Sequence, residues 1–147
     1  MNNHVNKGNA RKGIYADVIE KIGKERICPF CSEHLRKIHP NPLDERIHWI
    51  ITNNAYPYTP KKEHILLIHK EHISDIKDLS AEAWSELKSI IDELSKKRNI
   101  TGGSFILRFG ETKFTGASVT HLHAHLFQSD PDSQDYERKT GVLTRIG

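Results

Sequence analysis

Cysteine is scarce in this sequence, and long apolar runs are missing. Only two cysteines occur among the 147 residues, Cys28 and Cys31, too few for the disulfide framework of a small secreted protein. No segment approaches the ~18 uninterrupted apolar residues of a membrane helix, and the polar start MNNH lacks the apolar core of a secretory signal. We therefore expect a cytoplasmic protein without a membrane span.

An excess of charge of one sign is also missing. Lysine and arginine number 22 against 19 aspartates and glutamates, a formal net charge of +3, and the two signs are interspersed. This pattern argues against a dedicated nucleic-acid surface and is compatible with a small anionic ligand. The length of 147 residues allows one compact domain and effectively excludes two.

The hydrophobic pattern predicts a domain over residues 14–130, between a flexible N-terminal arm at 1–13 and a mostly polar C-terminal tail at 131–147. Tight turns and a single helical crossover favour an α+β fold with a mainly antiparallel sheet and helices on one side. We expect helices at 14–24 and 81–98, strands at 46–52, 64–68, 105–109 and 119–128, and loops at 28–44 and 110–118.

Histidine is the residue in excess, with ten imidazoles in the chain. Three of them alternate at His121, His123 and His125, inside an expected strand. Side chains alternate along a strand, so the imidazoles share one face and the apolar residues between them share the other. His121 and His125 would lie about 13 Å apart, too far for one zinc ion to bind all three. One end can then bind a metal while the middle and far histidines line a phosphate site.

The run His-Leu-His-Ala-His-Leu-Phe at 121–127 resembles the signature of the histidine-triad superfamily of nucleotide hydrolases and transferases. The pair Cys28 and Cys31, the segment 64–72 and the run 116–119 also resemble family elements, in the family's order. The sequence is most similar to the zinc-containing branch, which includes bacterial histidine-triad proteins, diadenosine polyphosphate hydrolases and phosphorylases, and galactose-1-phosphate uridylyltransferase. The resemblance implies a five-stranded sheet, a catalytic domain at 14–130 and a homodimer.

Such a strand is suited to nucleophilic attack on phosphorus. An imidazole with a pKa of about 6.5 is largely neutral at pH 7, so one nitrogen can attack while the other donates its proton to a backbone carbonyl. The resemblance gives this role to His123, which would attack the α-phosphate of a dinucleoside polyphosphate or a nucleoside phosphoramidate and form a covalent nucleotidyl-histidine. His125 and Ser118 would stabilise charge on the phosphate oxygens. By resemblance, His64 orients the triad rings and Asn54 binds the ribose.

Cys28 and Cys31, with two residues between them, supply half of a tetrahedral zinc site. The resemblance adds His72 and His121, so that a structural zinc would join the Cys-x-x-Cys segment to the catalytic strand. Three alternatives stay open. The cysteines could form a dithiol redox pair. His121 and His123 could hold a catalytic zinc in a metal-dependent hydrolase, or the chain could be a noncatalytic nucleotide-binding module.

The sequence departs from the family pattern next to the expected phosphate site. Arg108 and the two residues after it stand where the family usually has an asparagine, and Ala117 replaces a glutamine that is common beside the serine. Both changes affect phosphate recognition, so the leaving-group preference need not follow that of other members. Arg108 either contacts a phosphate or is a solvated charge on the strand.

Overall fold

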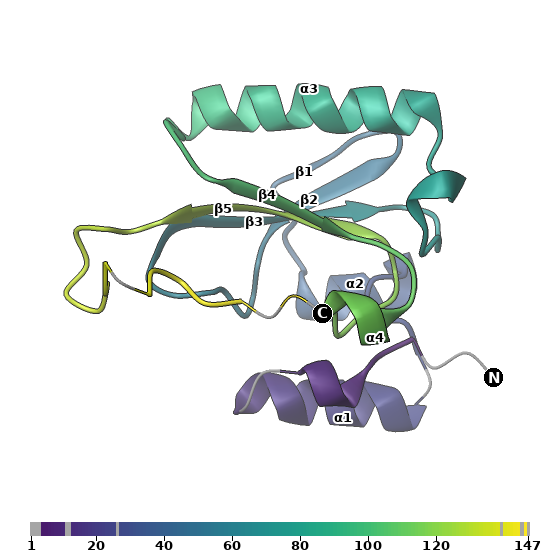
Figure 1. The fold of residues 1–147 in the computed structure, drawn as a ribbon. Coiled ribbons are helices and arrows are strands. Elements are labelled where there is room, and N and C mark those ends of the chain that lie inside the picture. Colours follow the sequence, from purple (N-terminus) through teal and green to yellow (C-terminus); the bar gives the residue numbers. More distant parts are fainter. Residues whose placement is uncertain (1–3, 11–12, 26, 139, 145, 147) are drawn as a thin grey trace.

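The structure, a computed structural model, describes residues 4–10, 13–25, 27–138, 140–144 and 146. A single sheet lies between helical layers (Figure 1). In chain order, with η for a 3-10 helix, the elements are η1 (Lys7–Asn9), α1 (Ile14–Glu25), α2 (Ser32–Ile38), β1 (Asp44–Glu45), β2 (Trp49–Asn53), β3 (Lys61–His69), η2 (Ile76–Asp78), α3 (Ala81–Lys97), β4 (Ser104–Arg108), α4 (Thr112–Thr115) and β5 (His123–Ser129).

Neighbouring strands of the sheet all pair antiparallel, in the order β1-β2-β3-β5-β4. The predicted α+β class with a five-stranded antiparallel sheet is confirmed. β5 lies between β3 and β4, so His123 pairs with Ile68 on one side and with Arg108 on the other. The backbone of His123 is therefore held by strands on both sides.

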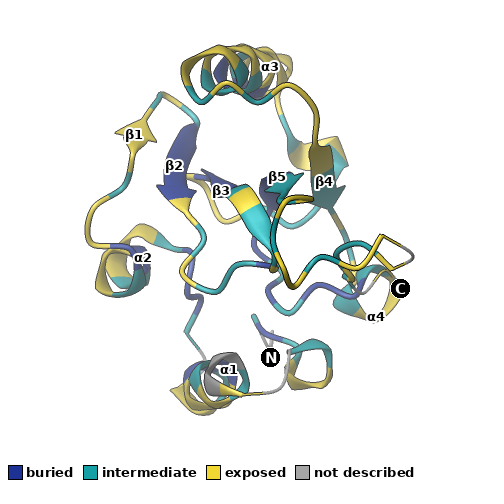
Figure 2. Cartoon of the chain, turned by 90° about the vertical axis from the view of Figure 1, so that its left-hand side faces the viewer, coloured by how far each residue is buried: buried dark blue, intermediate teal, exposed yellow. Residues whose placement is uncertain are grey.

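Helices cover both faces of the sheet, whereas the sequence predicted helices on one side only. α3 lies over one face, and α1 and α2 lie over the other (Figures 1 and 2). The physical reason is in the central strands, because residues 49–52 of β2 and 64–69 of β3 are all buried. Strands that bury both faces need a cover on each.

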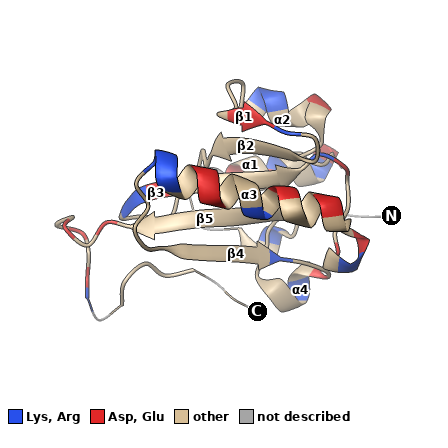
Figure 3. Cartoon of the chain, turned by 90° about the horizontal axis from the view of Figure 1, so that it is seen from above, with Lys and Arg blue, Asp and Glu red and all other residues tan. Residues whose placement is uncertain are grey.

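α3 begins at a side-chain cap, since the hydroxyl of Ser80 accepts a hydrogen bond from the backbone N–H of Ala83 at 3.0 Å. Leu87 and Ile90 then pack on the sheet, and the outer face carries charges of both signs (Figure 3). Trp84, in the first turn of this helix, is 47% exposed. Among the described residues, no helix combines the length and the apolar character needed to span a membrane.

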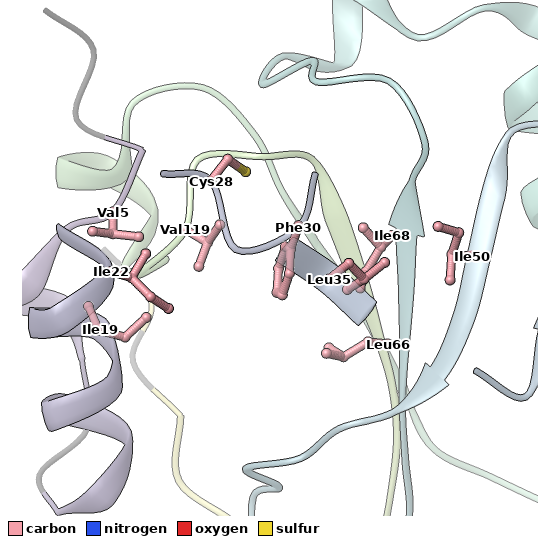
Figure 4. Close-up of a cluster of buried hydrophobic side chains, with 10 residues drawn as sticks. All are labelled: Val5, Ile19, Ile22, Cys28, Phe30, Leu35, Ile50, Leu66, Ile68 and Val119. Atoms are coloured by element: carbon pink, nitrogen blue, oxygen red, sulfur yellow. The ribbon is translucent and has the colours of Figure 1, made fainter. Parts of the chain in front are cut away.

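A second layer of buried side chains lies between the other face of the sheet and the N-terminal helices (Figure 4). Ile19 and Ile22 of α1, Leu35 of α2 and Leu66 of β3 meet in it. The sequence predicted a loop over 28–44, because prolines interrupt helical periodicity there. α2 forms within this range, between the prolines, and is anchored by the burial of Leu35.

Described residues near both ends of the chain pack on the domain. Of the flexible arm predicted at 1–13, residues 1–3 and 11–12 lie outside the described residues. Val5 is 3% exposed and forms an isolated antiparallel bridge with Val119. Near the other end, Thr144 accepts a hydrogen bond from the guanidinium of Arg108 at 3.0 Å. A single buried valine in a polar segment has no periodicity, so the sequence pattern could not indicate this packing.

Candidate functional site

The three alternating histidines lie on the face that α1 and α2 cover. His123 and His125 belong to β5, while His121 precedes the strand, which begins later than the predicted range of 119–128. All three side chains are buried, with at most 6% exposed. The alternation predicted that they share one face, and they are buried because the N-terminal helices form a second layer over this face. The residues between them, such as Leu122, enter the core beneath α3 as predicted.

The ring of His123 is held in one tautomer by the backbone. Its Nδ1–H donates a hydrogen bond to the carbonyl of His121 at 2.7 Å, so the lone pair of the neutral ring lies on Nε2. Burial lowers the pKa of His123 to about 4, against the opposing effect of that carbonyl, and the positive charge of Arg108 lowers it further. The ring is therefore neutral at pH 7 and can act as a nucleophile.

A chain of hydrogen bonds sets the tautomer of His125. The backbone N–H of Tyr58 donates to Nδ1 of His64 at 3.0 Å, so the proton of the neutral His64 ring is on Nε2. That nitrogen lies 2.9 Å from Nδ1 of His125 and donates to it. The proton of His125 is therefore on its own Nε2, which makes this nitrogen a hydrogen-bond donor.

Two aromatic rings that the sequence analysis did not single out hold these imidazoles in place. Tyr58 stacks on His125, with ring centroids 5.6 Å apart and planes inclined by 17°. Phe30 meets His123 edge to face at 4.8 Å. Tyr58 lies in the same turn as Asn54, whose amide nitrogen is 3.2 Å from Nε2 of His64. The aromatic residues of this turn were the only sequence signal that could have pointed to Tyr58.

His123 and His125 line a cavity of about 800 Å³, counted to its solvent-open mouth. Ser118, Asn54 and Arg108 also line the cavity and give it a polar end. Arg108 is half-buried there and is not a solvated strand-face charge, because its guanidinium donates to the hydroxyl of Tyr58 at 3.3 Å.

Next to this cavity, Cys28, Cys31, His72 and His121 place four ligand atoms within 4.8 Å of one another. Nδ1 of His121 lies 3.3 Å from Sγ of Cys28 and 3.8 Å from Sγ of Cys31. Nδ1 of His72 lies 3.3 Å from Sγ of Cys31. In a tetrahedral zinc site, bonds of about 2.0–2.3 Å separate neighbouring ligand atoms by roughly 3.3–3.8 Å. The donor set and its spacing therefore fit zinc.

The surroundings of the cluster also suit a metal. Nε2–H of His121 donates to the carbonyl of His69 at 2.6 Å, which leaves Nδ1 unprotonated and fixes the ring. Burial lowers the pKa of His121 to about 4, so the ring is neutral, as a ligand must be. Burial also raises the pKa of the Cys28 thiol to about 12, so binding of a metal would release its proton.

Comparison with known proteins places this chain in a family. Residues 27–141 match the family described as "Scavenger mRNA decapping enzyme C-term binding". An uncharacterized HIT-like protein of Helicobacter pylori (strain ATCC 700392 / 26695) is 33% identical over 76 residues, which are 51% of this chain and 73% of that protein. The chain belongs to the histidine-triad superfamily.

Two solved histidine-triad structures share the fold. A HIT family hydrolase from Legionella pneumophila Philadelphia 1 has a TM-score of 0.53 at 21% identity, over 74% of this chain and 98% of that chain. A zinc-bound histidine triad family protein from Mycobacterium smegmatis has a TM-score of 0.51 at 18% identity, over 63% of this chain and 68% of that chain. At these identities the likeness shows the fold alone.

Within this histidine-triad protein, the predicted site residues form two adjoining groups. His123, His125, Asn54 and Ser118 line the cavity, with His64 behind His125. The second group is the Cys2His2 cluster, which contains His121. His123 is not among the described side chains that gather there, which weakens the alternative of a catalytic zinc held by His121 and His123. Of the cavity lining, the sequence analysis missed the whole contribution of the N-terminal segment.

Proposed function

We propose that this histidine-triad protein is a nucleotide hydrolase or nucleotidyl transferase that attacks the α-phosphate of a nucleoside phosphate derivative through His123. One observation carries the proposal. Nδ1–H of His123 is bound to a backbone carbonyl, so the lone pair of a neutral imidazole is on Nε2, and His123 lines a solvent-open cavity together with His125, Ser118 and Asn54. Dinucleoside polyphosphates and nucleoside phosphoramidates are the substrates that we expect.

In the first step, Nε2 of His123 forms a bond to the α-phosphorus. The bond from phosphorus to the leaving oxygen or nitrogen breaks, and the leaving group takes the electron pair and a proton from solvent. Nε2–H of His125 and the guanidinium of Arg108 supply hydrogen bonds and positive charge to the phosphate oxygens. The products of this step are the leaving group and a nucleotidyl-His123.

In the second step, water attacks the same phosphorus and breaks its bond to Nε2 of His123. The nitrogen recovers its lone pair, and water loses one proton to solvent, which balances the proton taken up in the first step. An alcohol, phosphate or amine in place of water would make the protein a transferase. Asn54 lies in the cavity lining beside His64 and is positioned for the ribose hydroxyls.

Zinc held by Cys28, Cys31, His72 and His121 completes the proposal. The ion would hold the segment around Cys28 against His121, and so keep the layer that covers His123 in place. Its role would be structural. We also propose that the protein is cytoplasmic and that it forms a homodimer. β4 is an edge strand with an exposed Phe105, which is available for contact with a second copy. Light scattering in solution tests the dimer.

The proposed function is tested by trapping the intermediate. The protein is mixed with an adenosine phosphoramidate or with diadenosine polyphosphates, quenched in acid-free denaturant and examined by mass spectrometry. We expect the mass of one nucleoside monophosphate on the peptide that contains His123, and none in His123→Ala. His48→Ala, which removes a histidine outside the cavity lining, serves as the control and should keep the adduct. Turnover without any adduct in the wild type would contradict the covalent route.

A further inference from the structure

The N-terminal segment at 4–25 precedes the family match at 27–141, yet it forms part of the site. Val18, Ile19 and Ile22 of α1 line the same cavity as His123. α1 is thus an addition to the matched family domain that reaches the reacting group. This placement requires a function for α1 that the triad itself does not explain.

Part of the cavity lining is apolar, and we call this part its apolar end. Apart from α1, the apolar lining includes Phe30 and Leu66. In Figure 4, Ile19 and Ile22 project from α1 toward Phe30, and Leu66 lies on the far side of Phe30, on the sheet. A group that enters this end would therefore have α1 on one side and the sheet on the other.

Hydrogen bonds tie the N-terminal segment to the loop that precedes the triad. The amide nitrogen of Asn9 donates to the carbonyls of Thr112 and Ala117, at 2.9 and 2.8 Å. The backbone N–H of Asn6 donates to the carbonyl of Ser118 at 2.8 Å. Both asparagines thus fix the segment against the polar end of the cavity, so α1 has a defined position relative to His123.

Gly23 shows how closely the segment lies on α1. A Cβ at this position would be 2.7 Å from Cε of Lys7 and 3.2 Å from Cγ2 of Val5. The sequence pattern predicted a helix at 14–24, and α1 runs through Gly23 to Glu25. A side chain at position 23 would therefore require the end of Lys7 to move and Val5 to shift by a few tenths of an ångström, so the glycine suits the close approach of the segment.

We propose that α1 is the wall on which the base of the nucleotide packs, so that the N-terminal segment sets the preference for a nucleotide over the same phosphate without a base. The inference rests on the proposed function only for the position of the phosphate, at His123. With the phosphate there, the apolar end remains for the rest of the ligand. A flat, weakly hydrated base is the part of a nucleotide that gains most from apolar contact.

Binding measurements test this proposal without the need for turnover. Calorimetry on the full chain compares ribose 5-phosphate with AMP, GMP, CMP and UMP. We expect at least one nucleotide to bind tenfold or more tightly than ribose 5-phosphate. Val18→Trp should reduce this ratio at least tenfold, because the half-buried Val18 lines the apolar end and an indole would fill it. Lys21→Trp, on the exposed side of α1, is the matched control and should keep the ratio within twofold.

A second variant covers the case that Val18→Trp does not fold, which circular dichroism would show. Val18→Ala removes two methyl groups from the wall and should reduce the ratio by roughly two- to tenfold. The proposal is overturned if no nucleotide binds more tightly than ribose 5-phosphate, or if the folded variants keep the wild-type ratio. Nucleotide binding with the expected ratios but without an adduct would reject the covalent chemistry and leave the role of α1 supported.

Discussion

His121 and His123 are two residues apart, share one face of the molecule and are both buried. Burial lowers the pKa of each to about 4, and each ring donates one hydrogen bond to a backbone carbonyl. The two rings use different nitrogens for this hydrogen bond, however. His121 donates from Nε2 to the carbonyl of His69, and His123 donates from Nδ1 to the carbonyl of His121. The first therefore offers Nδ1 to the cysteines, and the second is left with its lone pair on Nε2.

This difference shows that the backbone assigns the roles of the two histidines. Residue type, burial and pKa are nearly the same for both, so none of them separates a metal ligand from a nucleophile. The acceptor carbonyl does, because it decides which nitrogen keeps its lone pair. Substitutions at the two sites test this difference. Changes around His123 should reduce the rate of catalysis, whereas changes around His121 should reduce the free energy of unfolding.

Replacement of His123 should give the largest effect. We expect His123→Ala to reduce kcat/KM by at least a thousandfold, since no other group supplies the attacking nitrogen. The fold and the affinity for the nucleotide should change little, because the variant loses one hydrogen bond and an edge-to-face contact with Phe30 while the rest of the cavity lining is unchanged. Steady-state kinetics and calorimetry measure these quantities. Activity near that of the wild type in the variant would remove His123 from the mechanism.

Replacement of a metal ligand should affect stability instead. Cys28→Ser should lose about one zinc ion per chain and several kcal/mol of unfolding free energy. The reason is that Cys28 belongs both to the Cys2His2 cluster and to the buried hydrophobic layer beneath α1. Elemental analysis and urea unfolding measure the two effects. A chelator should inactivate the protein only as fast as it unfolds. Immediate loss of turnover in a folded protein would instead favour the metal-dependent hydrolase.

Removal of the ring behind His125 should give a smaller kinetic effect. His64→Gln should lower kcat by roughly ten- to hundredfold with little change in KM, because His125 would no longer be held in the tautomer that has its proton on Nε2. Nitrogen NMR of the imidazoles reads the tautomer directly. A drop in kcat with the His125 tautomer unchanged would show that His64 acts in another way. His48→Ala is again the matched control.

The sequence was sufficient to predict structural elements where the hydrophobic pattern was periodic, and site residues where the motif was specific. The alternation around His123 correctly predicted which face each side chain takes, and the helix that contains Leu87 followed from its spacing. The Cys28 pair and His72 are far apart in the chain, and only the family resemblance brought them together before the structure did. Local periodicity contains no information on contacts of this kind.

The parts that the sequence analysis missed have a common cause. Val5 is one apolar residue in a polar segment, and its contact with Val119 spans most of the chain. The sequence did not decide the role of Arg108, because an arginine on an exposed strand face and one that lines a cavity have the same sequence pattern. The contact that distinguishes them is with Thr144, near the other end of the chain. Tautomers were also beyond reach, since they depend on which carbonyl lies opposite each ring.

The smallest effect that we predict concerns His39, a buried histidine whose Nδ1 lies near a side-chain hydroxyl. Nδ1 of His39 lies 3.4 Å from the hydroxyl of Thr52, and burial lowers the pKa of His39. Between the unfolded value of about 6.5 and the lower folded value, the unfolded state binds more protons. Stability should therefore fall as the pH falls through this window, and the contribution of His39 to the free energy of unfolding should be constant above it.

His39→Gln keeps a polar side chain and removes the titrating group, so it isolates this contribution from that of the other buried histidines. Urea unfolding between pH 7.5 and 5.0 should show a shallower loss of stability in the variant, by at most about 1.4 kcal/mol per pH unit, the limit for one proton. Because the same sign applies to every buried neutral imidazole, parallel curves for the two proteins would mean that His39 takes up its proton equally well when folded. Burial alone would then not explain why His121 and His123 stay neutral. Their carbonyl partners raise the pKa, so the neighbouring positive charges, such as that of Arg108 beside His123, would have to account for it.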